Sequence, residues 1–238
     1  MSFQRLVVVA ALAGSLAGVL LAVVHQIATV PLILQAEAFE ETTQTSTSAG
    51  SEHEHDHHTA AAWQPHDGFE RIGVTALTDV ATGIGFALLL VALSELCGQR
   101  LNWRRGLYWG LGGFAAVSLA PALGLPPELP GTEAAALLDR QLWWVATVVL
   151  TGMGLGLVFL VRKPLPALAG FALIALPHLY GAPQPSVQGS LAPAELARQF
   201  ALAATLSSLV FWVVMGMLAG FFQQRLTAAP SVRESAAV

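Results

Sequence analysis

The sequence predicts an all-α protein: a polytopic membrane helix bundle of six spans, with a disordered, histidine-rich loop outside the cytoplasm. Hydrophobic residues make up 55% of the 238 residues and charged residues only 11%, whereas about a quarter of a soluble domain is charged. The acidic residues are also concentrated, because eight of the 15 lie between Glu37 and Glu70. No basic patch is present, which argues against a nucleic-acid partner. The lipid bilayer is therefore the expected environment.

Six apolar runs account for the predicted spans. The first, residues 6–28, has 23 residues, which at ~1.5 Å per residue is enough for a hydrocarbon core of ~30 Å. A cleaved signal peptide is the alternative for this run, but its apolar region would be only ~7 to 15 residues long. We therefore expect a retained helix. The other runs are residues 72–94, 107–125, 142–161, 165–180 and 199–222.

The run at 165–180 decides between six spans and five. It has 16 residues and is flanked by prolines, so it forms either a short, tilted span or a re-entrant segment that lines a cavity. The charge distribution described below favours six spans.

Small residues three or four positions apart predict close packing between the helices, because they let two backbones approach each other. They occur as Ala10, Gly14, Gly18 and Ala22, then as Gly106, Gly110 and Gly113, as Gly152 and Gly156, and as Gly216 and Gly220.

The basic residues predict the orientation. With six spans and a cytoplasmic N-terminus, eight of the 11 Lys and Arg residues lie inside and three lie outside, namely Arg71, Arg140 and Arg198. Such a bias sets the topology of bacterial membrane proteins. Five spans would move Arg225 and Arg233 outside and weaken the bias.

The chain then divides into four parts. We expect a first helix and its exit at 1–36, an acidic loop outside the cytoplasm at 37–71, a five-helix bundle at 72–226 and a cytoplasmic tail at 227–238.

The outer loop contains a metal-binding type of sequence, SEHEHDHHTAAAWQPH at 51–66. Imidazole nitrogen suits cobalt, nickel, copper and zinc, and the carboxylates add anionic oxygen. We expect this loop to collect a divalent metal, and the alternative is a solvated acidic loop without a metal function. Its five histidines are His53, His55, His57, His58 and His66.

Four more residues of ligand type lie near the outer ends of the predicted spans. His25 lies close to the end of the first run and His178 close to the end of the fifth. Glu37 lies after the first run. Asp79 lies about 10 Å inside the second run, where a charged group is costly unless it faces the bundle interior or water. The alternative for Asp79 is a structural role, in which it pairs with Arg140 or with a backbone group and so holds helices together. Together the four predict an outer metal-binding vestibule.

The motifs exclude the common enzyme classes. HEHDHH is not the HExxH motif of zinc proteases, and GxSxG, phosphate-loop and CxxC motifs are missing. A single cysteine, Cys97, permits no internal disulfide. We expect no enzyme and no organic cofactor. Because no ATP-binding part is visible, uphill transport would need a partner or an ion gradient.

The order of four motifs resembles the CbtA family of proposed cobalt transporter subunits. The motifs are HQIATVPLILQAEAFE, the acidic histidine-bearing loop, QLWWVATVV and ALPHLYGAP. The matching polar positions are His25, Gln26, Glu37, Glu40, Trp143, Trp144 and His178.

This resemblance covers essentially the whole chain. It implies a multi-pass protein of the bacterial inner membrane, associated with cobalamin synthesis, and a small single-span CbtB-type partner with its own histidine-rich end. It also implies five spans, where the apolar runs predict six.

The sequence thus predicts a membrane subunit for uptake of cobalt or a related divalent ion. The loop would capture the ion, and His25, Glu37, Asp79 and His178 would pass it inward. Such ligands do not discriminate cobalt from nickel, copper or zinc. The alternative is a non-transporting membrane metal sensor or scaffold that presents the loop to a partner.

Overall fold

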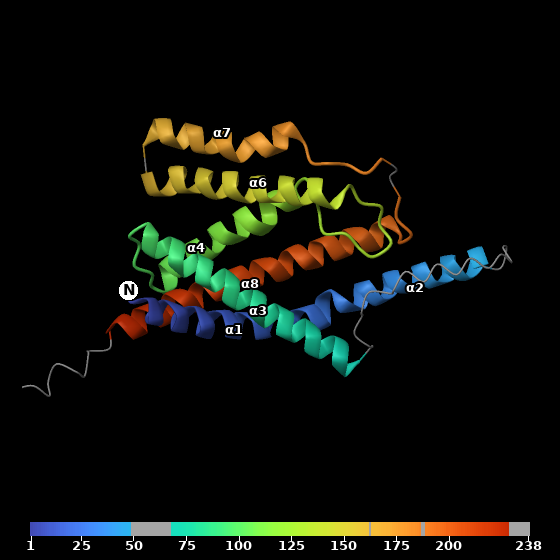
Figure 1. The fold of residues 1–238 in the computed structure, drawn as a ribbon, viewed down its shortest axis with the longest axis horizontal. Helices are drawn as coiled ribbons and strands as arrows, with labels where there is room; N and C mark the ends of the chain where they lie inside the picture. Colours follow the sequence, from blue (N-terminus) through green and yellow to red (C-terminus); the bar gives the residue numbers. More distant parts are fainter. Residues whose placement is uncertain (49–67, 162, 187–188, 229–238) are drawn as a thin grey trace, which may run out of the picture. The chain divides into compact units, whose positions relative to one another are not determined.

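A computed structural model describes residues 1–48, 68–161, 163–186 and 189–228. These residues form helices and connecting segments, and the extended pairing seen among them is one isolated bridge between Thr132 and Ser190. The predicted all-α membrane bundle is therefore confirmed (Figure 1). The histidine-rich segment falls at 49–67 and lies outside the described residues.

Within the described residues, four helices are long and apolar enough to cross a membrane. They are α1 (Phe3–Ala28), α3 (Phe69–Leu96), α6 (Leu137–Gly156) with its π-helical continuation η2 (Leu157–Val161), and Ala194–Thr227 within α8 (Ala194–Ala228). The predicted fifth span is the shorter apolar helix α7 (Pro164–Tyr180). Its 17 residues give a length of about 25 Å. The total of six spans stays a prediction.

The predicted third span is divided. It consists of α4 (Trp103–Phe114), a π-helical turn η1 (Ala115–Leu119) and a short α5 (Ala120–Ala122). Pro121 explains the change, because a proline has no N–H to donate and its ring clashes with the carbonyl group four residues before it. A π turn accommodates such a mismatch. The second π turn, η2, likewise ends three residues before Pro164.

The polar segment after the first span is more helical than expected. We expected the outer loop to begin at residue 37, whereas α2 (Val30–Ser48) continues to Ser48. Residues 32–49 contain neither glycine nor proline, so no residue forces an earlier end. The interruption between α1 and α2 comes at Thr29, two residues before Pro31, and its carbonyl oxygen accepts the N–H groups of Leu32 and Ile33 at 3.1 Å.

The described chain forms two compact units made of interleaved segments. Unit 1 contains Met1–Val23, Ala76–Ala115 and Ser208–Val238, and unit 2 contains Val24–Thr75 and Ala116–Ser207.

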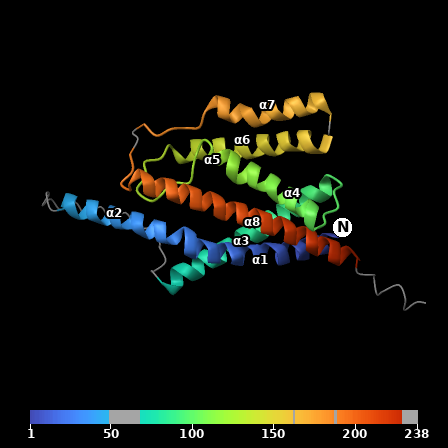
Figure 2. The same ribbon diagram turned by 180° about the vertical axis from the view of Figure 1, so that it is seen from behind.

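In unit 1 the helices meet at glycines. Gly14 and Gly18 of α1 are buried against α3, and Figures 1 and 2 both show these helices crossing. A Cβ atom on Gly14 would lie 2.5 Å from the carbonyl oxygen of Gly83. Likewise, a Cβ atom on Gly106 of α4 would lie 2.1 Å from the carbonyl oxygen of Gly216 on α8. The predicted close-packing glycines of these helices are confirmed.

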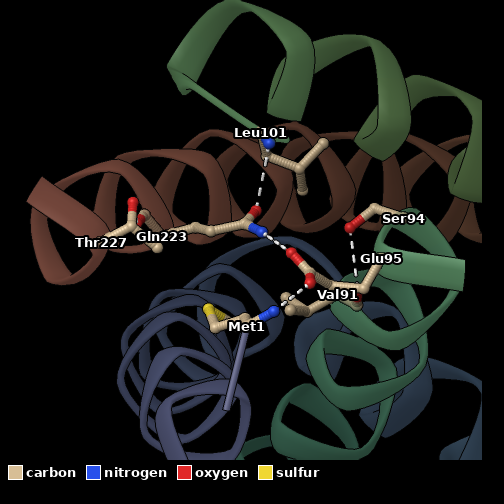
Figure 3. A network of polar contacts seen from close by, with 7 residues as sticks. All are labelled: Met1, Val91, Ser94, Glu95, Leu101, Gln223 and Thr227. Atoms are coloured by element: carbon tan, nitrogen blue, oxygen red, sulfur yellow. Dashed lines mark hydrogen bonds and ion pairs between the residues drawn. The ribbon is translucent and has the colours of Figure 1, made fainter. Parts of the chain in front are cut away.

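A partly buried polar network joins three segments at one end of unit 1 (Figure 3). The side chain of Gln223, 2% exposed, accepts the N–H of Leu101 at 3.2 Å and donates to the carboxylate of Glu95. Glu95 also pairs with the N-terminal ammonium group of Met1 at 2.7 Å. The carboxylate of Glu95, on α3, thus contacts both α8 and the N-terminus that precedes α1.

In unit 2, α6 and α7 form an antiparallel hairpin that lies side by side in both ribbon views (Figures 1 and 2). Their closest approach is at Gly154 and Gly170, where a Cβ atom on either residue would clash with the other's carbonyl oxygen. The predicted packing role of Gly152 and Gly156 is wrong for the described residues, because nothing lies within 4 Å of a Cβ atom at either position. Gly154 lies about 200° around the helix from both.

Candidate metal-binding site

A pocket in unit 2 lies where α1, α2, α3 and α8 come together. Its volume is about 320 Å³, and its lining combines an imidazole, a guanidinium group, two hydroxyl groups and apolar side chains. At about 30 Å³ per water molecule, it has room for roughly ten waters, and so for a hydrated metal ion. The lining residues are His25, Thr29, Val30, Ile33, Arg71, Thr75, Phe200 and Ala204.

His25 is the predicted ligand in this pocket. It lies in the last turn of α1, where the backbone N–H and the hydroxyl group of Thr29 both donate to its carbonyl oxygen, at 3.0 and 3.1 Å. Thr29 is only 5% exposed. These bonds close the end of α1 and so fix the backbone from which the imidazole projects.

Glu37, the second predicted ligand, is paired with Arg71. The two guanidinium nitrogens of Arg71 donate to the two carboxylate oxygens, Nη1 to Oε2 at 3.2 Å and Nη2 to Oε1 at 2.6 Å. The pair joins α2 to the first turn of α3, and about a third of each side chain stays exposed. Such a two-bond fork is stronger than a bond between neutral groups.

From the sequence, Arg71 was predicted only to contribute to the charge bias that sets the orientation. A signal was available, because Arg71 is one of three basic residues that the orientation places outside, and it is the last residue of the predicted acidic loop, directly before a predicted span. Most basic residues are predicted to lie on the cytoplasmic side, so a basic residue on the outer side suggests a specific acidic partner.

His178 lies in the last turn of α7 and is not among the residues that line the pocket. Its Nε2 atom is buried and finds no hydrogen-bond partner in the described part of the chain. The ring meets Trp143 edge to face, with 6.0 Å between ring centroids and an angle of 74°. Trp143 is itself held in place, because its Nε1 donates to the carbonyl oxygen of Pro177 at 3.2 Å.

Asp79 belongs to unit 1. It is 8% exposed, and its backbone lies against Gly18 of α1, so the residue is buried within the protein. Arg140, the predicted alternative partner of Asp79, forms an ion pair with Glu128 at 3.1 Å within unit 2.

The structure does not gather the predicted ligands into a cluster. Across residues 1–48, 68–161, 163–186 and 189–228, no three His, Cys, Asp or Glu side chains come close enough to hold a metal ion. One reason is that His25 and Glu37 lie 12 residues apart on two successive helices, α1 and α2, which separates their side chains. The other is Arg71, which engages Glu37. The loop residues His53, His55, His57, His58 and His66 lie outside the described residues.

A protein-family model described as "Probable cobalt transporter subunit (CbtA)" matches residues 3–224. The chain belongs to the CbtA family. The match runs from the start of α1 nearly to the end of α8, so the resemblance seen in the motifs is confirmed over the whole helical part. Neither a curated protein nor a solved structure matches the chain.

Membership of the CbtA family, together with the apolar helices, makes this a membrane protein and a cobalt transporter subunit. The family description gives cobalt as the transported ion. A transporter subunit of the CbtA type belongs to no enzyme class.

Proposed function

We propose that this CbtA-family chain takes up cobalt, or a related divalent transition ion, across the bacterial inner membrane. The N-terminus lies in the cytoplasm and the histidine-rich segment at 51–66 lies outside, where it captures the ion. His25 and Glu37 receive it, and Asp79 and His178 serve the passage inward.

The main support for this proposal is the pocket that His25 lines. An imidazole at the rim of a volume of about 320 Å³ can replace one water of a hydrated ion at a time, since cobalt(II) accepts nitrogen ligands readily. The pocket's hydroxyl groups, from Thr29 and Thr75, can hydrogen-bond the waters that remain. A purely apolar pocket would offer the ion nothing in exchange for its hydration.

The position of the histidine-rich segment in the chain supports a capture role. The segment connects α2 to α3, and the ion pair between Glu37 and Arg71 joins these same two helices. An ion bound to the segment is therefore linked through the chain to α2, which carries the Glu37 carboxylate, and to α3, which carries the pocket residue Arg71.

Two buried groups support a route within the bundle. Asp79 is a nearly buried acid within an apolar helix that is long enough to cross a membrane, and acids inside such helices often mark ion pathways. The Nε2 atom of His178 is a buried nitrogen without a hydrogen bond in the described residues, which is a costly arrangement that a passing ion would relieve. Thr75 precedes Asp79 by one turn of α3, so we place Asp79 after the pocket on the route.

Uptake of radioactive cobalt tests the proposal. Cells carry the chain with a small single-span, histidine-rich subunit of the CbtB type, which we propose as its partner. Asp79→Asn combined with His178→Ala should lower uptake at least tenfold, whereas Asp139→Asn, at an exposed acid in the first turn of α6, should leave it unchanged. Unchanged uptake in the double variant would refute the proposed route.

Deletion of residues 51–66 separates transport from the sensor or scaffold alternative. A transporter should keep cobalt uptake at high metal concentration and lose apparent affinity. A sensor should lose its metal response at every concentration, and cobalt uptake should not depend on it.

A further inference from the structure

The ion pair between Arg71 and Glu37 bears directly on how an ion binds. Both oxygens of Glu37 accept hydrogen bonds from Arg71, at 2.6 and 3.2 Å. The carboxylate keeps further lone pairs, but a divalent ion on them would lie within a few ångströms of the guanidinium group. Two positive charges at that distance repel each other strongly in a partly buried site. Glu37 therefore cannot bind the metal ion and the guanidinium group of Arg71 strongly at the same time.

The pair has the properties of a contact that can open. The side chains of Arg71 and Glu37 are 28% and 34% exposed, and ion pairs with this access to solvent are of modest strength. The guanidinium group also has room to move, because Arg71 lines the pocket of about 320 Å³ that it shares with His25. Water in this pocket can solvate the charge once Glu37 releases it.

We propose that Arg71 is a built-in competitor of the transported ion. Its guanidinium group occupies Glu37 while the site is empty, leaves when the ion binds, and returns when the ion moves on. The carboxylate then has a positive partner in both states. Arg71 thereby lowers the affinity of the site and speeds release. This inference rests on the proposed function, because it requires Glu37 to bind the ion.

Cobalt uptake kinetics and cobalt binding to the purified full-length chain test the inference. Arg71→Gln frees Glu37, so the apparent KM for cobalt should fall about three- to tenfold, and the maximal rate should fall as release slows. Arg71→Lys keeps the charge and breaks the two-bond fork, so its KM should lie between those of the wild type and Arg71→Gln.

Two controls distinguish competition at Glu37 from a general charge effect. Arg140→Gln removes another half-buried, paired arginine of unit 2 and should leave KM unchanged. In a Glu37→Gln background, Arg71→Gln should have no further effect, because the two residues act through one contact. An equal gain in affinity from Arg140→Gln, or in the Glu37→Gln background, would overturn the inference.

The remaining outcomes separate this inference from the proposed function. If the wild type neither binds nor imports cobalt, the proposed function fails and the inference fails with it. If the wild type imports cobalt but Arg71→Gln does not lower KM, only the inference fails. If the wild type imports cobalt but Glu37→Gln has no effect, the inference fails together with the proposed role of Glu37, and cobalt uptake itself stands. Should Arg71→Gln not fold, Arg71→Lys decides, and a KM no lower than that of the wild type rejects competition.

Discussion

Gly18 of α1 packs directly against the backbone of Asp79 on α3, and a Cβ atom on Gly18 would lie 2.6 Å from the carbonyl oxygen of Asp79. The buried acid therefore lies on a face of α3 that touches another helix backbone. The same face continues through Gly83, against which Gly14 packs. This contact explains how an apolar helix keeps a carboxylate away from lipid.

The first prediction concerns this helix contact. Gly83→Leu should destabilise the protein by about 1–3 kcal/mol, because a side chain would force α1 and α3 apart. Gly85→Leu is the matched control, since Gly85 is exposed two residues along α3 and nothing lies within 4 Å of its Cβ position. Thermal unfolding of the detergent-solubilised chain measures both. Equal melting temperatures for the two variants would contradict the contact.

The second prediction concerns the paired tryptophans. Trp143→Phe removes the donor to the Pro177 carbonyl oxygen and changes the ring contact with His178, at a cost of about 1–2 kcal/mol. Trp144→Phe should change stability by less than about 0.5 kcal/mol, because Trp144 is 38% exposed whereas Trp143 is 6% exposed. Thermal unfolding monitored by size-exclusion chromatography compares them. A larger loss for Trp144→Phe would reverse the assignment.

The third prediction concerns Gln223. Gln223→Leu leaves the buried N–H of Leu101 without its acceptor and removes one of the two donors to Glu95, so we expect a loss of about 1–3 kcal/mol. Gln224→Leu, at the exposed neighbouring position, should be nearly neutral. Denaturation in detergent compares the two variants. Similar stability for both would show that the network is unimportant for folding.

The fourth prediction tests the orientation with the natural thiol. Cys97 is exposed at the end of α3, which the proposed topology places in the cytoplasm. A membrane-impermeant maleimide should label it in inverted membrane vesicles and not in intact spheroplasts. Ser51→Cys in a Cys97→Ser background should show the opposite pattern. Labelling of Cys97 in intact spheroplasts would invert the proposed topology.

Several elements of the fold could be predicted because their signals are local. Apolar runs identified the helices, since a spanning helix must satisfy its backbone internally and present apolar side chains to lipid. The spacing of Gly14 and Gly18 placed them on one face, and that face is buried. The helical extent of α2 was missed because a polar sequence does not reveal whether a preceding helix continues.

The candidate site was less predictable. His25, Glu37, Asp79 and His178 were chosen as polar residues near span ends, and chain position alone could not say which of them share a pocket. His25 lines one, while Glu37 is bound by Arg71, a residue 34 positions away. No sequence spacing encodes that pairing.

The sequence by itself determined the membrane-helix class, the family and the glycine faces of α1, α4 and α8, because composition, motif order and helical periodicity are properties of neighbouring residues. Only the tertiary structure decided that Gly154 rather than Gly152 meets α7, that Trp143 rather than Trp144 is buried, and that Arg71 engages Glu37. Each of these depends on which face of one helix meets another. Packing between distant segments settles that choice.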